Sequence, residues 1–326
     1  MHMRDYGYLL PTRGAVLTSE SRSALTASVQ ADVIEAASRA EAMGFRSIWV
    51  GDSVLAKPRL EPLTTLAAVA AETDTVDLGT AVYLPALRDP VHVAHLTATV
   101  DQLSGGRLSL GVGVGIGSDV AAEYANLGIP YGERGARMDE ILEIVTRLWS
   151  GASIDYDGDY YQLSDASIGF APTIDPEIYV PSAAFDPSEG FPPPIRNRIV
   201  AHADGWLPIA VSPDTYEHGL ASVREFLDDA GRDPDAITPA LYLDVVIGEE
   251  SDAIEQAREF YDRYYPDWDR LTDEQIRAKG VFGPPAEVAE ALAAYEDAGL
   301  EHAVVRFTTT EQRTQLRRFA GIADLD

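Results

Sequence analysis

The feature of this sequence that most constrains its fold is a repeated alternation of short apolar runs with longer segments of helical periodicity. The short runs have the length and composition of buried strands, and the longer segments carry apolar residues three and four positions apart. The strands are expected at residues 6–10, 47–50, 76–82, 108–112, 178–180, 205–209, 241–247 and 303–307. The helices are expected at residues 27–43, 63–71, 91–103, 138–149, 215–230, 253–264 and 286–298.

Strands that alternate with helices pair in parallel, because each helix carries the chain back to the same edge of the sheet. About eight such strands are enough to close a barrel. We therefore predict an α/β fold, a single (β/α)8 (TIM) barrel domain over residues 1–326. Three long stretches interrupt the alternation, at residues 153–176, 182–194 and 265–282. We expect them to be insertions in the loops at the carboxyl ends of the strands, where such barrels carry out their chemistry.

The charge balance disfavours polyanionic partners. The chain has 25 Lys and Arg residues against 53 Asp and Glu residues, which gives a net charge of −28, and Lys57 and Lys279 are its only lysines. Such a protein repels nucleic acids and anionic membranes. Because concentrated salt screens the self-repulsion of an acidic surface, the composition predicts a halophilic source, with an ordinary acidic cytosolic protein as the alternative.

The residues that are missing limit the chemistry and the compartment. Without cysteine the chain has no disulfide, no thiolate nucleophile and no zinc–thiolate site. His92 and His95 are the one close histidine pair, and no third ligand lies near them, so we expect no metal ion. The first residues lack the pattern of a signal peptide, and no apolar run reaches the roughly 18 residues of a membrane-spanning helix. We expect a soluble, cytoplasmic protein.

Candidate site residues follow the predicted strands. Asp52 and Ser53 come just after the second strand, although an aspartate there also starts turns and caps helices. Ala81 and Val82 end the third strand, where packing alone also explains them. After the fourth strand, glycine occupies every second position from 111 to 117, so the backbone there can approach a flat ligand closely. The spacing is not that of a dinucleotide-binding loop, and a P-loop lysine is missing.

The order and spacing of these motifs resemble the bacterial luciferase-like superfamily of flavin- and deazaflavin-dependent oxidoreductases. Residues 105–113, with Arg107 after a glycine pair, carry the resemblance together with residues 87–103 before them. It covers most of residues 4–150 and about residues 284–320. It implies a (β/α)8 barrel that binds an isoalloxazine or 5-deazaisoalloxazine ring at the carboxyl ends of its strands.

The resemblance assigns the ring contacts to the ends of three neighbouring strands. Asp52 matches a position that contacts the ring. Ala81 and Val82 match a bulge in the third strand, where deazaflavin-dependent relatives hold a non-proline cis peptide against the ring, so a cis bond here favours the deazaflavin branch. The residues that match positions beside the ring after the fourth strand are Gly113, Val114 and Gly115.

The resemblance also implies a cradle for the cofactor phosphate. The matching segment consists of Ser182, Ala183 and Ala184. Phe185 and the proline-rich stretch after it depart from the small residues and glycines that relatives usually carry there. Arg196 and Arg198 are possible charge partners for the phosphate.

Two departures narrow the subgroup. Luciferases and the sugar-phosphate dehydrogenases of the family often have a histidine after the aspartate, where this chain has Ser53, and the latter group also has a tryptophan that is missing here. Both activities are therefore disfavoured. We predict an oxidoreductase that transfers a hydride between the deazaflavin coenzyme F420 and a small organic substrate, with Asp52 and Ser53 as the catalytic residues. Further candidate proton donors are Tyr83, Asp119 and Glu123.

Three other possibilities stay open at this point. The first is an FMN-dependent luciferase-like monooxygenase that receives reduced flavin from a partner reductase. The second is a non-catalytic barrel in which residues 182–194 block the phosphate end of the pocket. The third concerns assembly: family members commonly form homodimers, and Leu66, Val69 and Ala70 supply either an apolar interface or a buried core face.

Overall fold

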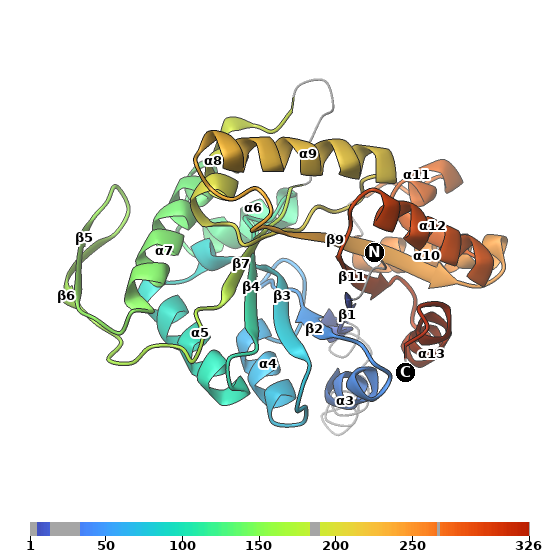
Figure 1. Ribbon diagram of the computed structural model, residues 1–326, viewed down its shortest axis with the longest axis horizontal. Coiled ribbons are helices and arrows are strands. Elements are labelled where there is room, and N and C mark those ends of the chain that lie inside the picture. Colours follow the sequence, from blue (N-terminus) through green and yellow to red (C-terminus); the bar gives the residue numbers. More distant parts are fainter. Residues whose placement is uncertain (1–4, 14–32, 183–189, 266–267, 326) are drawn as a thin grey trace.

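The computed structural model describes residues 5–13, 33–182, 190–265 and 268–325, and its strands close into the predicted parallel barrel (Figure 1). Going around the barrel, the order is β11, β1, β2, β3, β4, β7, β8 and β9, and β9 pairs with β11 to complete the ring. These strands are β1 (Asp5–Leu9), β2 (Ser47–Val50), β3 (Asp77–Tyr83), β4 (Leu108–Val112), β7 (Glu177–Val180), β8 (Gly205–Trp206), β9 (Thr238–Ile247) and β11 (His302–Phe307).

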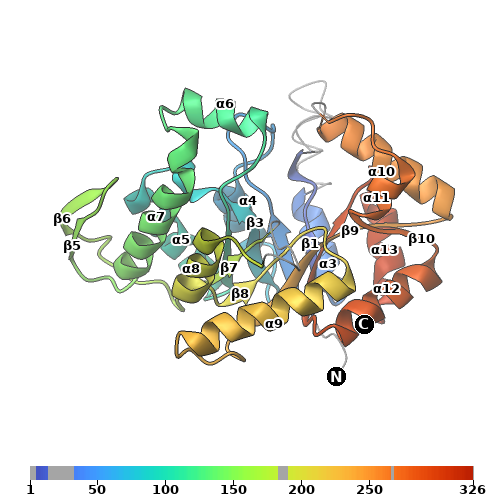
Figure 2. The same cartoon turned by 90° about the horizontal axis from the view of Figure 1, so that it is seen from above.

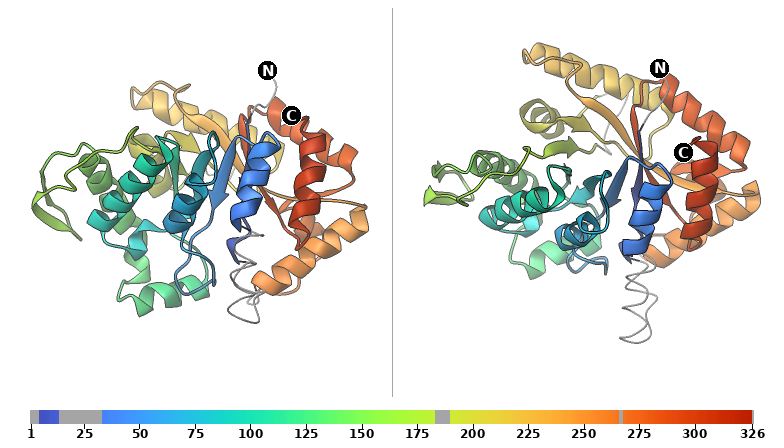
Figure 3. Two further views of the ribbon diagram at one scale, coloured as in Figure 1. Left: turned by 90° about the horizontal axis from the view of Figure 1, so that it is seen from below. Right: turned by 60° about the horizontal axis from the view of Figure 1, so that its bottom comes forward.

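Helices surround the barrel (Figures 1 and 2). They are α3 (Glu35–Ala42), α4 (Pro62–Ala70), α5 (Pro90–Ser104), α6 (Ser118–Asn126), α7 (Arg134–Leu148), α8 (Pro193–His202), α9 (Pro213–Asp229), α10 (Glu250–Tyr264), α11 (Asp273–Arg277), α12 (Pro285–Asp297) and α13 (Gln312–Ile322). The two ends of the described chain meet, because β1 pairs with β11 and α3 lies beside α13 (Figure 3). Glu35 and Arg313 form an ion pair of 3.3 Å between these two helices.

The signature around Arg107 is a structural element. Helix α5 begins at Pro90 after Asp89, whose carboxylate accepts the N–H of Val91, and it ends at Gly105 in the left-handed conformation that glycine favours. The guanidinium of Arg107 then donates to four backbone oxygens, those of Ser104 at 2.7 Å, Val76 at 2.8 Å, Thr73 at 3.0 Å and Ala70 at 3.2 Å. Arg107 thereby joins the end of α4 to the starts of β3 and β4.

The predicted barrel is confirmed, with two differences in the insertions. Residues 153–176 contain the hairpin of β5 (Ile154–Asp157) and β6 (Gln162–Ala166), which lies between α7 and β7 and therefore in a helix-to-strand connection. Residues 182–194 begin just after β7, as expected, whereas residues 265–282 follow helix α10. Residues 265–282 include α11 and most of β10 (Gly280–Gly283), which pairs with β9 outside the ring.

Trp49 fills the inside of the barrel. Its side chain is 1% exposed and packs with Leu9, Ala81 and Tyr179 in an interior cluster. Glycines on both flanking strands make room for it, because a Cβ at Gly7 or Gly79 would lie 2.6 Å and 2.3 Å from atoms of the indole. The upper members of the same cluster, among them Leu207 and Tyr242, form the floor of the cavities described below.

Some predictions about surface and assembly gain no support here. Leu66, Val69 and Ala70 lie in the core of the protomer, each less than 9% exposed, so they do not offer an exposed interface. The homodimer, the halophilic source and the exclusion of nucleic acid stay predictions. Within the described ranges, no helix combines the length and the apolar character that crossing a bilayer requires.

The amino end of the barrel generates a prediction about pH. Buried His302 lies 2.9 Å from the hydroxyl of Ser47, which also accepts the indole N–H of Trp49 at 2.6 Å. Burial, with a smaller contribution from Arg46, lowers the pKa of His302 to about 4. An unfolded histidine titrates near pH ~6.5, so the unfolded chain binds an additional proton between these values, and the free energy of unfolding decreases as the pH falls.

We expect His302 to account for about 2 kcal/mol of lost stability between about pH 7 and about pH 5. Urea unfolding at both pH values measures it. The His302→Gln variant removes this titration, so its stability should depend less steeply on pH than that of the parent chain, while the carboxylates contribute equally to both. Equal dependence in the two proteins would contradict the assignment.

Candidate active site

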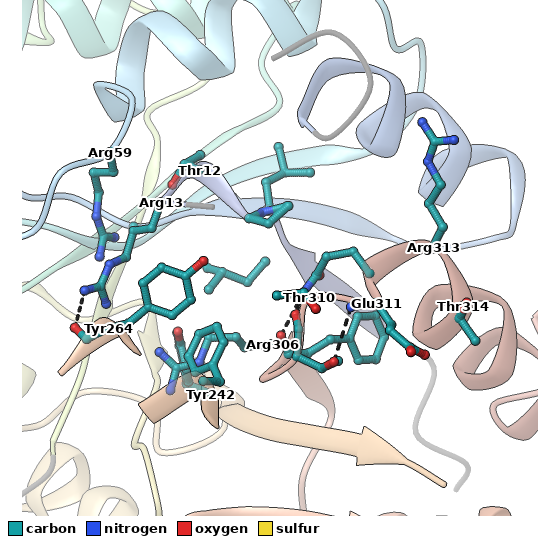
Figure 4. A pocket seen from close by; sticks show the side chains of 18 residues that line it. Thr12, Arg13, Arg59, Tyr242, Tyr264, Arg306, Thr310, Glu311, Arg313 and Thr314 are labelled. Atoms are coloured by element: carbon teal, nitrogen blue, oxygen red, sulfur yellow. Dashed lines mark hydrogen bonds between the residues drawn. The ribbon is translucent and has the colours of Figure 1, made fainter. Parts of the chain in front are cut away.

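Two adjoining cavities open at the carboxyl ends of the strands. The first, which we call the slot, has a volume of about 220 Å³, and the second, the chamber, about 510 Å³. The slot lies between the ends of β2, β3 and β4 and includes Asp52, Ser53, Ala81, Val82 and Gly115 in its lining. The chamber lies at the ends of β1, β9 and β11 (Figure 4). Arg59, Tyr242 and Arg306 line both cavities, so the two are neighbours.

Asp52 is bound on both of its oxygens. Oδ2 accepts hydrogen bonds from Nη1 of Arg88 at 2.6 Å and from the N–H of Leu84 at 2.9 Å, and Oδ1 accepts one from Nη2 of Arg88 at 3.0 Å. The Asp52 side chain is fully buried. A bidentate pair of this kind is strong and directional, so it ties the end of β2 to the loop after β3. Asp52 is thus part of the slot wall.

Ser53 belongs to a hydrogen-bonded loop anchor. Its hydroxyl donates to Oε1 of Glu123 at 3.1 Å and accepts the N–H of Lys57 at 2.8 Å. The same carboxylate oxygen accepts the N–H groups of Val54, of Leu55 at 2.6 Å and of Ala56 at 3.3 Å. Glu123 is 1% exposed and comes from α6, so this helix holds the loop after β2 in place.

The third strand has the predicted irregularity. Its register with β4 shifts between Thr80 and Tyr83, and the peptide bond between Ala81 and Val82 is cis, as the resemblance implies. Gly113 lies against Val82, since a Cβ there would be 2.6 Å from its Cγ2. The wall of the slot on this side is therefore made of small groups.

The structure places the remaining predicted residues around this wall. Gly115 has a φ of 67° and leaves no space for a Cβ, which would lie 2.7 Å from Val120. The carbonyl of Val114 accepts the hydroxyl of Tyr124 at 3.1 Å. Buried Ser182 accepts the indole N–H of Trp206 at 2.9 Å. Ala183 and Ala184 lie outside the described residues, as does Phe185.

The other charged candidates are already engaged. Arg198 pairs with Asp139 at 2.6 Å and Arg196 with Asp229 at 3.2 Å. Asp119 pairs with Lys57 at 3.0 Å. Burial raises the pKa of Tyr83 above its ordinary value, and its hydroxyl has no hydrogen-bond partner in the described part of the chain. None of the described residues form a group of three or more His, Cys, Asp or Glu side chains suited to a metal ion.

Several lining residues were missed by the sequence analysis. Arg306 on β11 forms a bidentate pair with Asp244 on β9, with Nε to Oδ1 at 2.6 Å, and the hydroxyl of Tyr261 donates to Asp244 at 2.5 Å. A usable signal existed, because an arginine and an aspartate each interrupt an otherwise apolar strand. Tyr265 and Arg59 carry no such signal, since each sits in a loop whose path only the fold defines.

Tyr265 is the phenol with the most unusual electrostatic surroundings. Its hydroxyl accepts Nη1 of Arg306 at 3.0 Å, and the guanidinium of Arg13 lies 5.0 Å from its ring centre. Burial by itself raises the pKa of Tyr265, but the positive charges of Arg306 and Arg13 outweigh it and hold the pKa below its ordinary value. The slot is thus lined by a phenol that ionises more readily than a free tyrosine.

Comparison with known proteins agrees with this architecture. Residues 5–302 match the model of the luciferase-like monooxygenase family. The chain is 28% identical over 313 residues to the F420-dependent glucose-6-phosphate dehydrogenase of Kineococcus radiotolerans, covering 87% of this chain and 89% of the relative. Among solved structures, an F420-dependent secondary alcohol dehydrogenase in complex with an F420-acetone adduct superposes with a TM-score of 0.80 at 20% identity over the whole of both chains.

A monooxygenase has a similar fold as well. RslO1 from Streptomyces bottropensis superposes with a TM-score of 0.77 at 23% identity, over 97% of this chain and 98% of that one. The fold and the slot thus define an oxidoreductase barrel. The chain belongs to the luciferase-like monooxygenase family. Its long match to a dehydrogenase named for F420 confirms the predicted resemblance to the F420-dependent branch.

The loop anchor generates a prediction about stability. We expect Glu123→Ala to lower the free energy of unfolding by about 3 kcal/mol, because backbone and hydroxyl donors of the loop lose a charged acceptor. Urea unfolding measures this change. Glu290→Ala, on the exposed face of α12, is the matched control and should leave stability unchanged. A Glu123→Ala protein as stable as this control would show that the loop does not depend on the carboxylate.

Proposed function

We propose that this protein transfers a hydride between F420 and a small organic substrate. The observation that carries the proposal is the slot, whose wall of Ala81, Val82 and Gly115 leaves room for a flat ring at the carboxyl ends of the strands. The long match to a dehydrogenase named for F420 supports the deazaflavin over other flat ligands.

The residues present fit such a ring. Small groups form one wall, and Pro181, Leu207 and Ile209 add apolar surface around the same cavity. An apolar slot with few polar groups is typical of cofactor sites. When bound, the deazaflavin supplies a ring carbon that carries a hydride. The protein then has to place the substrate carbon next to that position and exclude water from it.

The substrate is proposed to occupy the chamber. Arg59, Tyr242 and Arg306 separate the chamber from the slot and belong to both, so a molecule in the chamber is adjacent to one in the slot. Glucose 6-phosphate, which appears in the name of the Kineococcus relative, is disfavoured here. Ser53 stands where the resemblance expects a histidine, and its hydroxyl is already bonded to Glu123.

Tyr265 is our candidate for the group that moves the proton. A carbonyl that gains a hydride needs a proton on its oxygen, and an alcohol that loses one must release it. Tyr265 lines the slot, and the nearby guanidiniums stabilise the ionised form of its hydroxyl. Asp52 and Ser53, the predicted catalytic residues, are proposed to act by positioning, since each is held in hydrogen bonds to the protein.

The second candidate function is an FMN-dependent monooxygenase. The superposition with RslO1 shows that the same barrel also occurs in a monooxygenase, and the slot would hold either ring. In that case reduced flavin would come from a partner reductase. The cofactor that binds more tightly decides between the two functions.

Titration of the purified protein with F420 and with FMN tests the proposal. We expect F420 to bind more tightly than FMN. The fluorescence of each cofactor changes on burial in the slot, so it measures the binding. Ile209→Trp fills the slot and should abolish binding, whereas Leu103→Trp, on the exposed face of α5, should not. Tighter binding of FMN would favour the monooxygenase. Binding of neither cofactor would favour the non-catalytic barrel.

A spectroscopic titration tests the role of Tyr265 without a known substrate. Because its pKa is lowered, the phenolate of Tyr265 should form at a lower pH than that of an ordinary tyrosine. The difference in ultraviolet absorbance between the parent chain and Tyr265→Phe isolates this phenolate. Tyr156→Phe is the control, since burial and Glu143 raise the pKa of Tyr156 to about 12. A Tyr265 signal at or above the pH of ordinary tyrosines would exclude it as the proton carrier.

A further inference from the structure

Two guanidinium groups, those of Arg13 and Arg59, face the chamber and have no carboxylate partner among the described residues. From them we infer that the chamber binds the anionic oxygen group of an amphipathic organic acid, a carboxylate or a phosphate monoester, with Arg13 and Arg59 as its anchors. The inference rests on the proposed function in one respect, because it takes the occupant of the chamber to be the substrate of the hydride transfer. It deepens that function by naming the substrate class.

Arg59 is a cation with unused donors. It forms no ion pair with any described residue, and its Nε is buried without a hydrogen-bond partner there. Its guanidinium lies against the backbone of Gly51, where a Cβ would be only 2.1 Å from Nη1. Any larger residue than glycine at this strand end would therefore force the Arg59 guanidinium to shift. Burial also lowers the pKa of Arg59, and it outweighs the opposing effects of Tyr265, Tyr242 and Asp52.

Arg13 shares this situation. It donates to the backbone carbonyl of Tyr264, but its Nε and Nη1 are buried and have no partner within the described ranges. Its guanidinium lies 4.8 Å from the ring centre of Tyr264. Figure 4 shows the Arg13 and Arg59 side chains reaching the same side of the chamber. Burial, together with the charges of Arg59 and Arg306, lowers the pKa of Arg13 to about 10 against the opposing effect of the neighbouring phenols.

The other charged groups of the chamber do not neutralise this pair. Arg306 is itself neutralised by Asp244. Glu311 is the one carboxylate among the described residues that line the chamber; it is exposed, and Figure 4 shows it on the side away from Arg13 and Arg59. In a chain with 25 basic and 53 acidic residues, two adjacent arginines that pair with no carboxylate of the described ranges are a local excess of positive charge. An anionic ligand group would supply the missing charge and accept the free N–H donors.

The rest of the lining specifies the body of the ligand. Leu9, Leu10, Phe260 and Phe307 contribute apolar surface to the same chamber. A cavity of about 510 Å³ is large enough for a small organic molecule. The combination of an apolar lining with two guanidiniums on one side favours a compound with an apolar body and one anionic end. A sugar phosphate fits this lining poorly, because its hydroxyls would face leucine and phenylalanine side chains.

The position of the arginines separates them from the predicted cofactor phosphate cradle. Ser182 follows β7, whereas the chamber opens at β1 and its neighbours. Strands β1 and β7 are four places apart in the eight-stranded ring and therefore lie on opposite sides of the barrel. The acidic tail of the cofactor is nevertheless a second source of the same anionic chemistry, so the experiment has to distinguish it from a substrate.

Calorimetry on the full-length protein saturated with F420 tests the inference. The probes are benzoate, phenyl phosphate and neutral benzamide. We expect the two anions to bind about tenfold more tightly than benzamide, and Arg13→Met and Arg59→Met each to weaken their binding by about tenfold or more. Arg59→Lys keeps the positive charge and should lose less affinity for the anions than Arg59→Met. Arg46→Met is the matched control, because Arg46 is 59% exposed near the amino end of β2 and should leave binding unchanged.

Three results would overturn the inference. The first is that benzamide binds as tightly as benzoate. The second is that the two arginine variants bind the anions as tightly as the Arg46→Met control. The third result concerns the cofactor: if both variants weaken F420 but not its tail-less precursor, and leave benzoate binding unchanged, then the arginines hold the cofactor tail. Circular dichroism and thermal unfolding show whether each variant is folded, and Arg59→Lys provides the answer if the methionine variants are not.

The same measurements keep the inference apart from the proposed function. Repeating the probe titrations without cofactor separates the two sites. If F420 fails to bind while the anions bind in an arginine-dependent manner, the proposed function is wrong and the anion site stands. If F420 binds while the anions ignore the arginine substitutions, the cofactor assignment stands and the substrate class is wrong.

Discussion

The packing of Trp49 inside the barrel is the constraint on which the rest of the structure depends. A parallel barrel has to fill its interior with side chains, and here one indole occupies that space between Gly7 and Gly79 on the flanking strands. Its N–H is satisfied by Ser47, which in turn contacts His302 across the amino end of the barrel. Because this layer is full, the space that a ligand can use begins above it, at the carboxyl ends of the strands.

Ion pairs and hydrogen bonds at those strand ends shape the two cavities. The pair of Asp52 with Arg88 ties β2 to the loop after β3, and Glu123 of α6 anchors the loop after β2. That anchored loop leads into residue 59, so the same construction that walls the slot also delivers a guanidinium to the boundary of the chamber. Rigid support of this kind matters for hydride transfer, where the positions of two carbon atoms relative to each other determine the rate.

Sequence reasoning located some parts of the site and missed others for physical reasons. The alternation of strands and helices placed Asp52, Ala81 and Gly115 correctly at neighbouring strand ends, because parallel strands end at one edge of the sheet. It did not reveal that Asp52 is neutralised by Arg88, which is 36 residues further along the chain. Nor did it reveal Arg59 in the site, since a loop residue gains a location only when distant strands position its neighbours.

By itself the sequence determined the barrel, the family and the absence of cysteine chemistry, because periodicity, local motifs and composition are properties of the chain read in order. Only the tertiary structure decided which charges remain without a partner. Arg13, Arg59 and Arg306 come from opposite ends of the chain and look alike in sequence, yet Arg306 meets Asp244 and the other two meet no carboxylate in the described part of the protein. Pairing depends on distances of a few ångströms between residues far apart in sequence, and folding alone sets those distances.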